Sequence, residues 1–106
     1  MALPASLQRR ELLGTGGMGM VHAAEQMSLN REVAIKRVRP ERLNDGSDAQ
    51  LQREAYLMGQ LEHPAIPPLH MVATADNQCV LVMRRVRGIS WDQKLEHYDL
   101  EIAGTI

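Results

Sequence analysis

The alternation of apolar and polar residues predicts a chain built mainly of β-strands. Residues 18–25 alternate with the period of two expected of a half-buried strand, and residues 31–38 are rich in valine and isoleucine. Pro40 ends the latter stretch because a proline has no N–H to donate to a sheet. Three further strands are expected at 7–13, 69–75 and 79–85, with a tight turn at Asp76-Asn77 between the last two.

Helical periodicity appears between the third and fourth expected strands. Ser47 begins a capping-box pattern in which Gln50 reaches back to the helix start, and His63-Pro64 stops the helix after about Glu62. The apolar residues at helical spacing are Leu51, Ala55, Met58 and Leu61. A second capping-box pattern, Ser90-Trp91-Asp92-Gln93, opens a short final helix. Five mainly antiparallel strands with one helix inserted after the third predict an α+β fold.

Composition places these elements in one small cytoplasmic domain. The chain has 106 residues, of which 44% are hydrophobic, so we expect a single domain over 1–106 with residues 1–6 flexible. A net charge of −1 and short arginine clusters argue against a nucleic-acid partner. The single cysteine, Cys79, fits a reducing compartment, and the four histidines lack the spacing of a metal site. The start of the chain is not a signal peptide, and no stretch of it could span a membrane.

A glycine cluster lies between the first two strands. It reads Gly14-Thr15-Gly16-Gly17-Met18-Gly19 and is followed by another strand. That setting disfavours a dinucleotide-binding loop, which opens a helix, and a P-loop would need Gly-Lys-Ser/Thr. Gly14, Gly16 and Gly19 would let the backbone approach a phosphate chain closely, whereas the simplest alternative is a glycine-rich hairpin turn with no ligand.

Two charged residues fall on apolar faces. Lys36 shares a strand face with Ala34 and Val38, and Glu54 shares the helix stripe of Leu51. Each could reach solvent on its own, the lysine by snorkelling and the glutamate at the edge of its stripe. If the two face each other, however, both buried charges are compensated.

The order of these features resembles the N-terminal lobe of a protein kinase. The glycine cluster is followed by Val33-Ala34-Ile35-Lys36 and then by Glu54, and Gly-Gly-Met-Gly at the loop tip resembles bacterial Ser/Thr kinases of the eukaryotic type. The resemblance implies ATP as cofactor, with Lys36 contacting the α- and β-phosphates and Glu54 holding Lys36 as the catalytic pair. It covers about residues 7–95, including the helix-to-strand turn at 61–66.

The same resemblance implies an adenine pocket. Met83 would be the gatekeeper, and the backbone of Arg84 and Val86 in the hinge would bind the adenine edge. The position after the gatekeeper is often acidic in these kinases, whereas here it is Arg84. Met58 and Leu69 would stack behind the helix as residues of the hydrophobic spine. The nucleotide-binding residues implied are Leu13, Gly14, Thr15, Gly16, Gly17, Met18, Gly19, Val21, Ala34, Lys36, Met83, Arg84 and Val86.

The sequence lacks the rest of the kinase machinery. It contains no His-Arg-Asp, Asp-Phe-Gly or Ala-Pro-Glu, so we expect an inactive fragment that binds nucleotide weakly and uses Mg²⁺ only with a C-terminal lobe. The full-length parent would transfer the γ-phosphate of ATP to hydroxyls of a protein substrate. The alternative is a non-catalytic, pseudokinase-like binding or regulatory module.

Without that second lobe, an apolar surface is expected to face water. The side chains that would sandwich the nucleotide are those of Leu13, Val21, Ala34 and Met83. Exposed apolar patches favour self-association, so a homodimer or higher homo-oligomer is predicted at high concentration.

Overall fold

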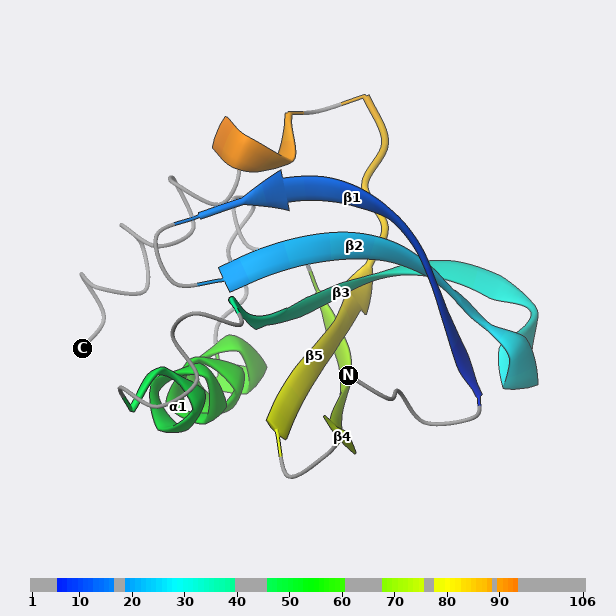
Figure 1. Ribbon diagram of the computed structural model, residues 1–106. Helices are drawn as coiled ribbons and strands as arrows, with labels where there is room; N and C mark the ends of the chain where they lie inside the picture. The colour runs from blue at the N-terminus through cyan, green and yellow to red at the C-terminus, as the bar shows by residue number, and fades with distance from the viewer. Residues whose placement is uncertain are drawn as a thin grey trace.

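Five antiparallel strands form one sheet in the order β1-β2-β3-β5-β4 (Figure 1). The computed structural model describes residues 6–16, 19–39, 46–60, 68–75, 78–88 and 90–93. Its elements are β1 (Leu7–Thr15), β2 (Gly19–Gln26), the 3-10 helix η1 (Met27–Leu29), β3 (Arg31–Val38), α1 (Ser47–Gln60), β4 (Leu69–Ala75) and β5 (Gln78–Arg84). The predicted α+β fold, with one helix after the third strand, is confirmed. The expected turns at 61–66 and 76–77 lie outside the described residues, as does all of the expected flexible leader except Ser6.

The first strand extends further into the glycine cluster than the sequence suggested. Gly14 and Thr15 still pair with β2, opposite Val21 and Met20, because the Gly16 N–H donates to the Gly19 carbonyl at 2.8 Å and closes a tight turn. Two irregularities in the β1–β2 register fall on either side of Leu12, and β1 curves strongly over the sheet (Figure 1).

The hairpin between β2 and β3 has an unbroken register from Gly19 opposite Val38 to Gln26 opposite Arg31. Its connection is η1, which the sequence did not predict, followed by Asn30 in the left-handed conformation with φ of 48°. Asparagine is one of the few residues that adopt this conformation readily. Regular pairing of period two therefore fixes which β3 side chains share a face.

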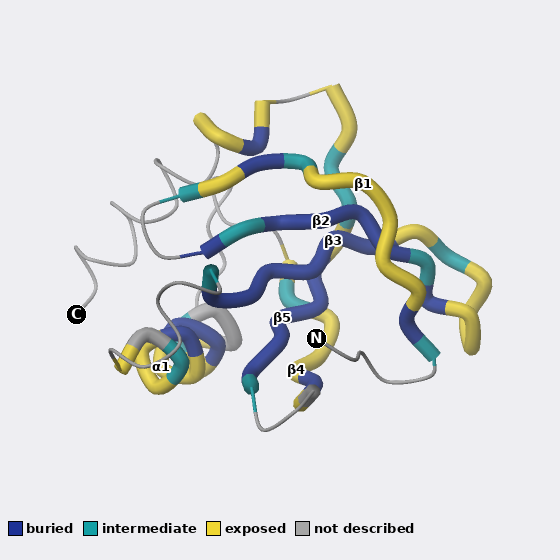
Figure 2. Tube along the Cα trace, in the orientation of Figure 1, coloured by how far each residue is buried: buried dark blue, intermediate teal, exposed yellow. Residues whose placement is uncertain are grey.

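Those two faces bury separate apolar clusters. Leu51 and Ala55 of α1 pack on the face formed by Val21, Ala34, Val38, Cys79, Leu81 and Met83. The opposite face gathers Leu7, Ala24, Val33, Ile35, Ala73, Val80 and Val82. Figure 2 shows burial concentrated along β2, β3 and β5, with much of β1 and the outer side of α1 exposed. Lys36 lies on the face that α1 covers.

The start of α1 is tied to β5. The Asp48 carboxylate accepts a hydrogen bond from the Cys79 N–H at 2.8 Å, and the Gln50 N–H donates to the Gly46 carbonyl at 3.2 Å. The Ser47 side chain lies outside the described residues, so its capping role stays a prediction, as does the spine role of Met58. These contacts fix the position of the helix against the sheet.

A short helical turn at 91–93 follows the last strand. Ser90 Oγ accepts a hydrogen bond from the Gln93 N–H at 3.5 Å, which confirms that part of the second capping box. In Figure 1 this turn lies beside the end of β1. Trp91, at its start, is buried.

Candidate nucleotide-binding site

A buried ion pair joins β3 to α1. Lys36 Nζ lies 3.1 Å from Glu54 Oε2, and the two side chains are 2% and 5% exposed. The geometry confirms that the two residues face each other. Neither side chain reaches solvent, so the alternatives of a snorkelling lysine and a glutamate at the edge of its helix stripe are excluded. Removing charges from water is costly, so a pair buried this deeply persists only when each charge meets its partner.

The glycine-rich end of β2 lies directly over this pair. A Cβ placed on Gly19 would come within 3.0 Å of Lys36 Cε and 3.1 Å of the Arg37 carbonyl oxygen. Only a residue without a side chain allows the backbone so close to the lysine. The arrangement brings the glycine-rich backbone close to a fixed cation, a combination suited to binding a phosphate group.

Arg39 adds a contact to the glycine turn that the sequence did not reveal. Its Nη1 donates to the Gly16 carbonyl at 3.3 Å. Arg39 follows the end of β3, so the alternation of strand residues does not predict which way its side chain points. Gly17 and Met18, both expected at the nucleotide, lie outside the described residues.

The apolar residues expected to hold adenine do come together. Val21, Ala34 and Met83 belong to one cluster, with Leu13 and Val86 packed against it, and Ala34 lies opposite Met83 in the β3–β5 register. The expectation that the side chains around the nucleotide would be open to water is wrong for three of the four, because Val21 and Ala34 are 0% exposed and Met83 is 1% exposed. Leu13 is partly buried. The predicted homo-oligomer therefore loses the apolar patch on which it rested and stays an untested prediction.

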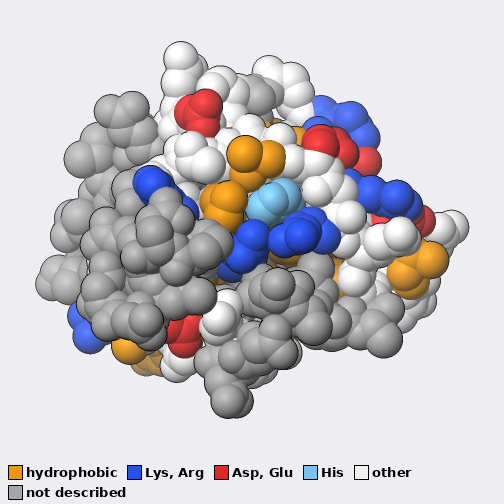
Figure 3. Space-filling model, viewed as in Figure 1, with side chains coloured by type: hydrophobic (Ala, Val, Ile, Leu, Met, Phe, Trp, Pro, Cys, Tyr) orange, Lys and Arg blue, Asp and Glu red, His pale blue; other side chains and the backbone are white. Residues whose placement is uncertain are grey.

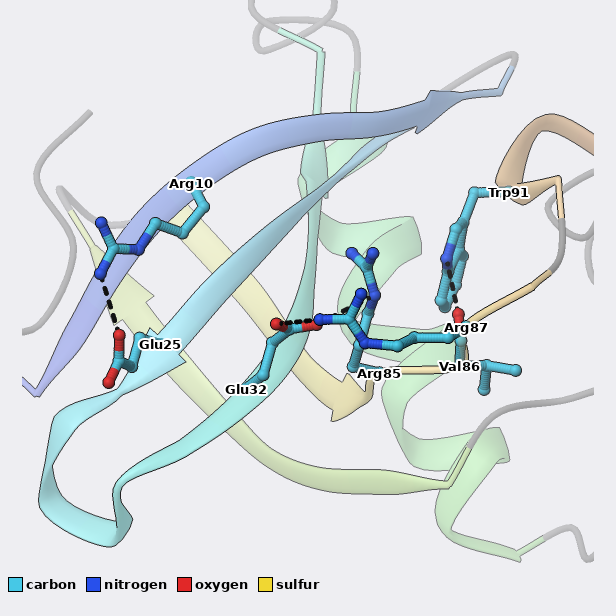
Figure 4. Close-up of polar contacts among 7 residues, drawn as sticks. All are labelled: Arg10, Glu25, Glu32, Arg85, Val86, Arg87 and Trp91. Atoms are coloured by element: carbon cyan, nitrogen blue, oxygen red, sulfur yellow. Dashed lines mark hydrogen bonds and ion pairs between the residues drawn. The ribbon is translucent and has the colours of Figure 1, made fainter.

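Trp91 is a member of this cluster that sequence reasoning missed. Its side chain is 4% exposed, and its indole N–H donates to the Val86 carbonyl at 3.3 Å (Figure 4). A Cβ on Gly14 would lie 2.8 Å from Trp91 Cβ, so the two backbones are in close contact. The next residue, Asp92, accepts a hydrogen bond from the Thr15 N–H at 2.8 Å. The one available signal was a lone tryptophan directly after a capping serine.

The hinge arginines are tied to β3 by a residue outside the predicted site. Glu32 pairs with Arg85 at 3.2 Å and with Arg87 at 2.6 Å (Figure 4). The Arg84 N–H donates to the Pro68 carbonyl at 3.0 Å, while its side chain is exposed. Sequence adjacency indicated a basic cluster, but only the fold brings Glu32 beside it.

The comparisons with known proteins agree with this geometry. A family model described as "Protein kinase domain" matches residues 7–103. The chain belongs to the protein kinase family. It is 37% identical over 92 residues to the serine/threonine-protein kinase PknD of Mycobacterium tuberculosis, which covers 86% of this chain and 14% of that protein. PknH of Mycobacterium bovis is 36% identical over 90 residues, 84% of this chain and 15% of that kinase.

A relative outside the mycobacteria shows the same partial coverage. The kinase pkn2 of Myxococcus xanthus is 39% identical over 79 residues, which are 74% of this chain and 10% of its own length. The chain therefore spans about one seventh or less of these bacterial kinases, as the three shares of 14%, 15% and 10% show. The resemblance to an N-lobe of the bacterial eukaryotic-like type is confirmed.

Basic side chains gather around His22 of β2. Burial, together with Arg37 and Arg9, lowers the pKa of His22, and burial with Arg9 lowers the pKa of Arg37. Figure 3 shows one face of the molecule, on which a histidine lies among hydrophobic side chains and side chains of Lys and Arg. We expect His22 to be neutral at pH 7, because its pKa already lies below its ordinary value of 6.5.

The described part of the lobe shows neither a membrane-spanning helix nor a cluster of metal ligands. Within those residues no helix is both long and apolar enough to cross a bilayer. No three His, Cys, Asp or Glu residues among them gather in a way that could hold a metal ion.

Proposed function

We propose that this chain is the ATP-binding N-lobe of a Ser/Thr protein kinase whose full-length form transfers the ATP γ-phosphate to protein hydroxyls. The observation that carries the proposal is the Lys36–Glu54 pair at 3.1 Å beneath Gly19. A lysine held by a helix glutamate beside a glycine-rich strand turn is the arrangement that positions nucleotide phosphates in kinases.

The chain's own residues divide the work of holding ATP. Lys36 and the backbone of the glycine turn would bind the phosphates, with Glu54 keeping the ammonium in place. Leu13, Val21 and Ala34 would enclose the adenine, and the Arg84 and Val86 backbone would bind its polar edge. Packing of Leu13 and Val86 against the cluster of Val21 and Ala34 supports that placement.

Phosphoryl transfer needs groups that the 106-residue sequence does not contain. The family's catalytic aspartate and metal-binding residues belong to sequence motifs that are absent here. Mg²⁺ would be held by such a C-terminal lobe together with the ATP phosphates. We therefore propose that the chain alone binds ATP weakly and has no kinase activity, and that the protein substrate is selected by the full-length parent.

Calorimetric titration with ATP, with and without Mg²⁺, tests the proposal. We expect weaker than micromolar affinity for the chain and a further loss in Lys36→Met, while Arg53→Met, which alters an exposed residue of α1, binds like the unsubstituted chain. Circular dichroism of each variant would confirm that it is folded. Equal binding by folded Lys36→Met, or no binding at all, would overturn the proposal and favour the non-catalytic module.

A further inference from the structure

The Trp91 indole lies where the proposed adenine pocket needs open space. The ring is 4% exposed and shares one apolar cluster with Val21, Ala34 and Met83, the side chains expected around a purine. An interior at protein packing density leaves no room for a second flat bicyclic ring in the same place. Binding of a nucleotide base there therefore requires Trp91 to leave.

The indole also occupies a polar group of the hinge. Its N–H donates to the Val86 carbonyl at 3.3 Å, on the residue whose backbone is proposed to recognise adenine (Figure 4). An aromatic bicycle with one N–H donor thus imitates part of a purine base, both in its stacking surface and in its hinge contact.

Contacts on the neighbouring residues hold the ring in position. The Thr15 N–H donates to Asp92 Oδ1 at 2.8 Å, which fastens the turn to the end of β1. At Gly14 the backbones approach so closely that a Cβ would lie 2.8 Å from Trp91 Cβ and 2.9 Å from the Asp92 nitrogen. The turn at 91–93 therefore bridges the end of β1 and the hinge.

We propose that Trp91 is a built-in competitor of nucleotide: it closes the adenine pocket, and ATP binds only when the turn at 91–93 releases the ring. This inference rests on the proposed function, since it assigns a gate to that same site. The apparent affinity of a site equals its intrinsic affinity multiplied by the fraction of molecules that are open. Weakening the Trp91 contacts should therefore tighten nucleotide binding, although no nucleotide contact is added.

Fluorescence provides a direct readout because Trp91 is the single tryptophan in the chain. We expect blue-shifted emission that is protected from acrylamide before ATP is added, and a red shift with increased quenching when ATP saturates the site. The excitation wavelength should avoid nucleotide absorption. Titration with GTP, whose base presents a different polar edge to the hinge, gives the specificity of the effect.

Calorimetric affinities of four variants test the gate independently of the fluorescence. We expect Trp91→Ala to bind ATP about tenfold more tightly, and Trp91→Phe, which keeps a ring but loses the indole N–H, about threefold more tightly. Asp92→Ala alters an exposed side chain and should also tighten binding about threefold by loosening the turn. Tyr56→Ala, which removes an aromatic side chain 69% exposed on α1, is the matched control and should leave the affinity unchanged.

The outcomes separate the gate from the nucleotide site itself. ATP binding with unchanged Trp91 emission, together with equal or weaker binding by Trp91→Phe and Asp92→Ala, would overturn the gate and leave the proposed function standing. Absence of ATP binding by the unsubstituted chain and by every Trp91 and Asp92 variant would overturn the proposed function, and the gate with it. The two milder variants keep the test decisive if Trp91→Ala does not fold.

Discussion

Lys36 on β3 and Glu54 on α1 form an ion pair at 3.1 Å, with side chains only 2% and 5% exposed. The pair connects the sheet to α1 across the face where the apolar cluster lies. It thereby couples the position of α1 to the position of the Lys36 ammonium beneath Gly19 of β2. Movement of α1 away from β3 would separate these two buried charges.

Removing one member of this pair should be more harmful than removing both. Glu54→Ala leaves the Lys36 ammonium buried without its carboxylate, and we expect a loss of about 3–5 kcal/mol in the free energy of unfolding. The double variant Lys36→Met/Glu54→Leu replaces both charges with apolar groups and should recover most of that loss. Urea denaturation followed by circular dichroism measures both. A double variant as unstable as Glu54→Ala would contradict this reading of the pair.

The contact between Asp48 and the Cys79 N–H should stabilise the lobe from the other end of α1. Asp48→Ala leaves a buried-strand amide without its acceptor at 2.8 Å, and we expect a loss of about 1–3 kcal/mol. Gln52→Ala is the matched control, because Gln52 donates to the other oxygen of the same carboxylate at 3.2 Å from an exposed position. Its effect should stay within about 0.5 kcal/mol. Similar thermal unfolding temperatures for the two variants would count against a structural role for Asp48.

A side chain at Gly14 should detach the turn at 91–93 from β1. In Gly14→Ala the new Cβ would lie 2.8 Å from Trp91 Cβ and 2.9 Å from backbone atoms, so the turn has to shift. We expect the Trp91 emission to move to longer wavelength. Gly46→Ala is the control, since a Cβ there meets open space and suffers only from a φ of +85°, at a cost of about 1–2 kcal/mol. Its tryptophan emission should not change, and an equal red shift in both variants would contradict the packing described for Gly14.

The thiol of Cys79 should be unreactive in the folded lobe. Burial, with Asp48 and Glu54 nearby, raises the pKa of Cys79 from 9.0 to about 11, so the nucleophilic thiolate is scarce at neutral pH. The unfolded chain ionises first as the pH rises. The stability contributed by keeping the Cys79 thiol protonated is therefore complete below pH 9.0 and is lost as the pH rises toward about 11. Iodoacetamide labelling at pH 8 should be slow without urea and fast in urea, and equal rates would refute the burial.

Much of this lobe follows from local patterns in the sequence. Period-two alternation located β2, richness in valine and isoleucine located β3, and the helical stripe through Leu51 and Ala55 located α1. Lys36 and Glu54 could be paired in advance because each places a charge on an apolar face. That charge is visible in the local sequence, and a partner from another element compensates it. The extent of β1 was underestimated, since glycines weaken the strand signal at Gly14 although the backbone continues to pair there.

Contacts between distant segments left no local trace. Thr15 and Asp92 are 77 positions apart, Glu32 and Arg87 are 55 apart, and Asp48 and Cys79 are 31 apart. Thr15, Asp92, Glu32 and Arg87 would be unremarkable as exposed polar positions in their own segments. The Asp48 contact is made to a backbone N–H, which no side-chain pattern reveals. The burial of Trp91 likewise depends on how the turn after the hinge folds back against β1, which no periodicity encodes.

The central claim is that the glycine cluster at 14–19, Lys36 and the hinge together form a nucleotide site. Amide chemical-shift mapping of the isotope-labelled chain during an ATP titration tests it most directly. We predict saturable shifts concentrated at Gly14, Gly16, Gly19, Lys36 and Val86, and their loss in folded Lys36→Met. Shifts confined to other surfaces, or a pattern unchanged by Lys36→Met, would contradict the account.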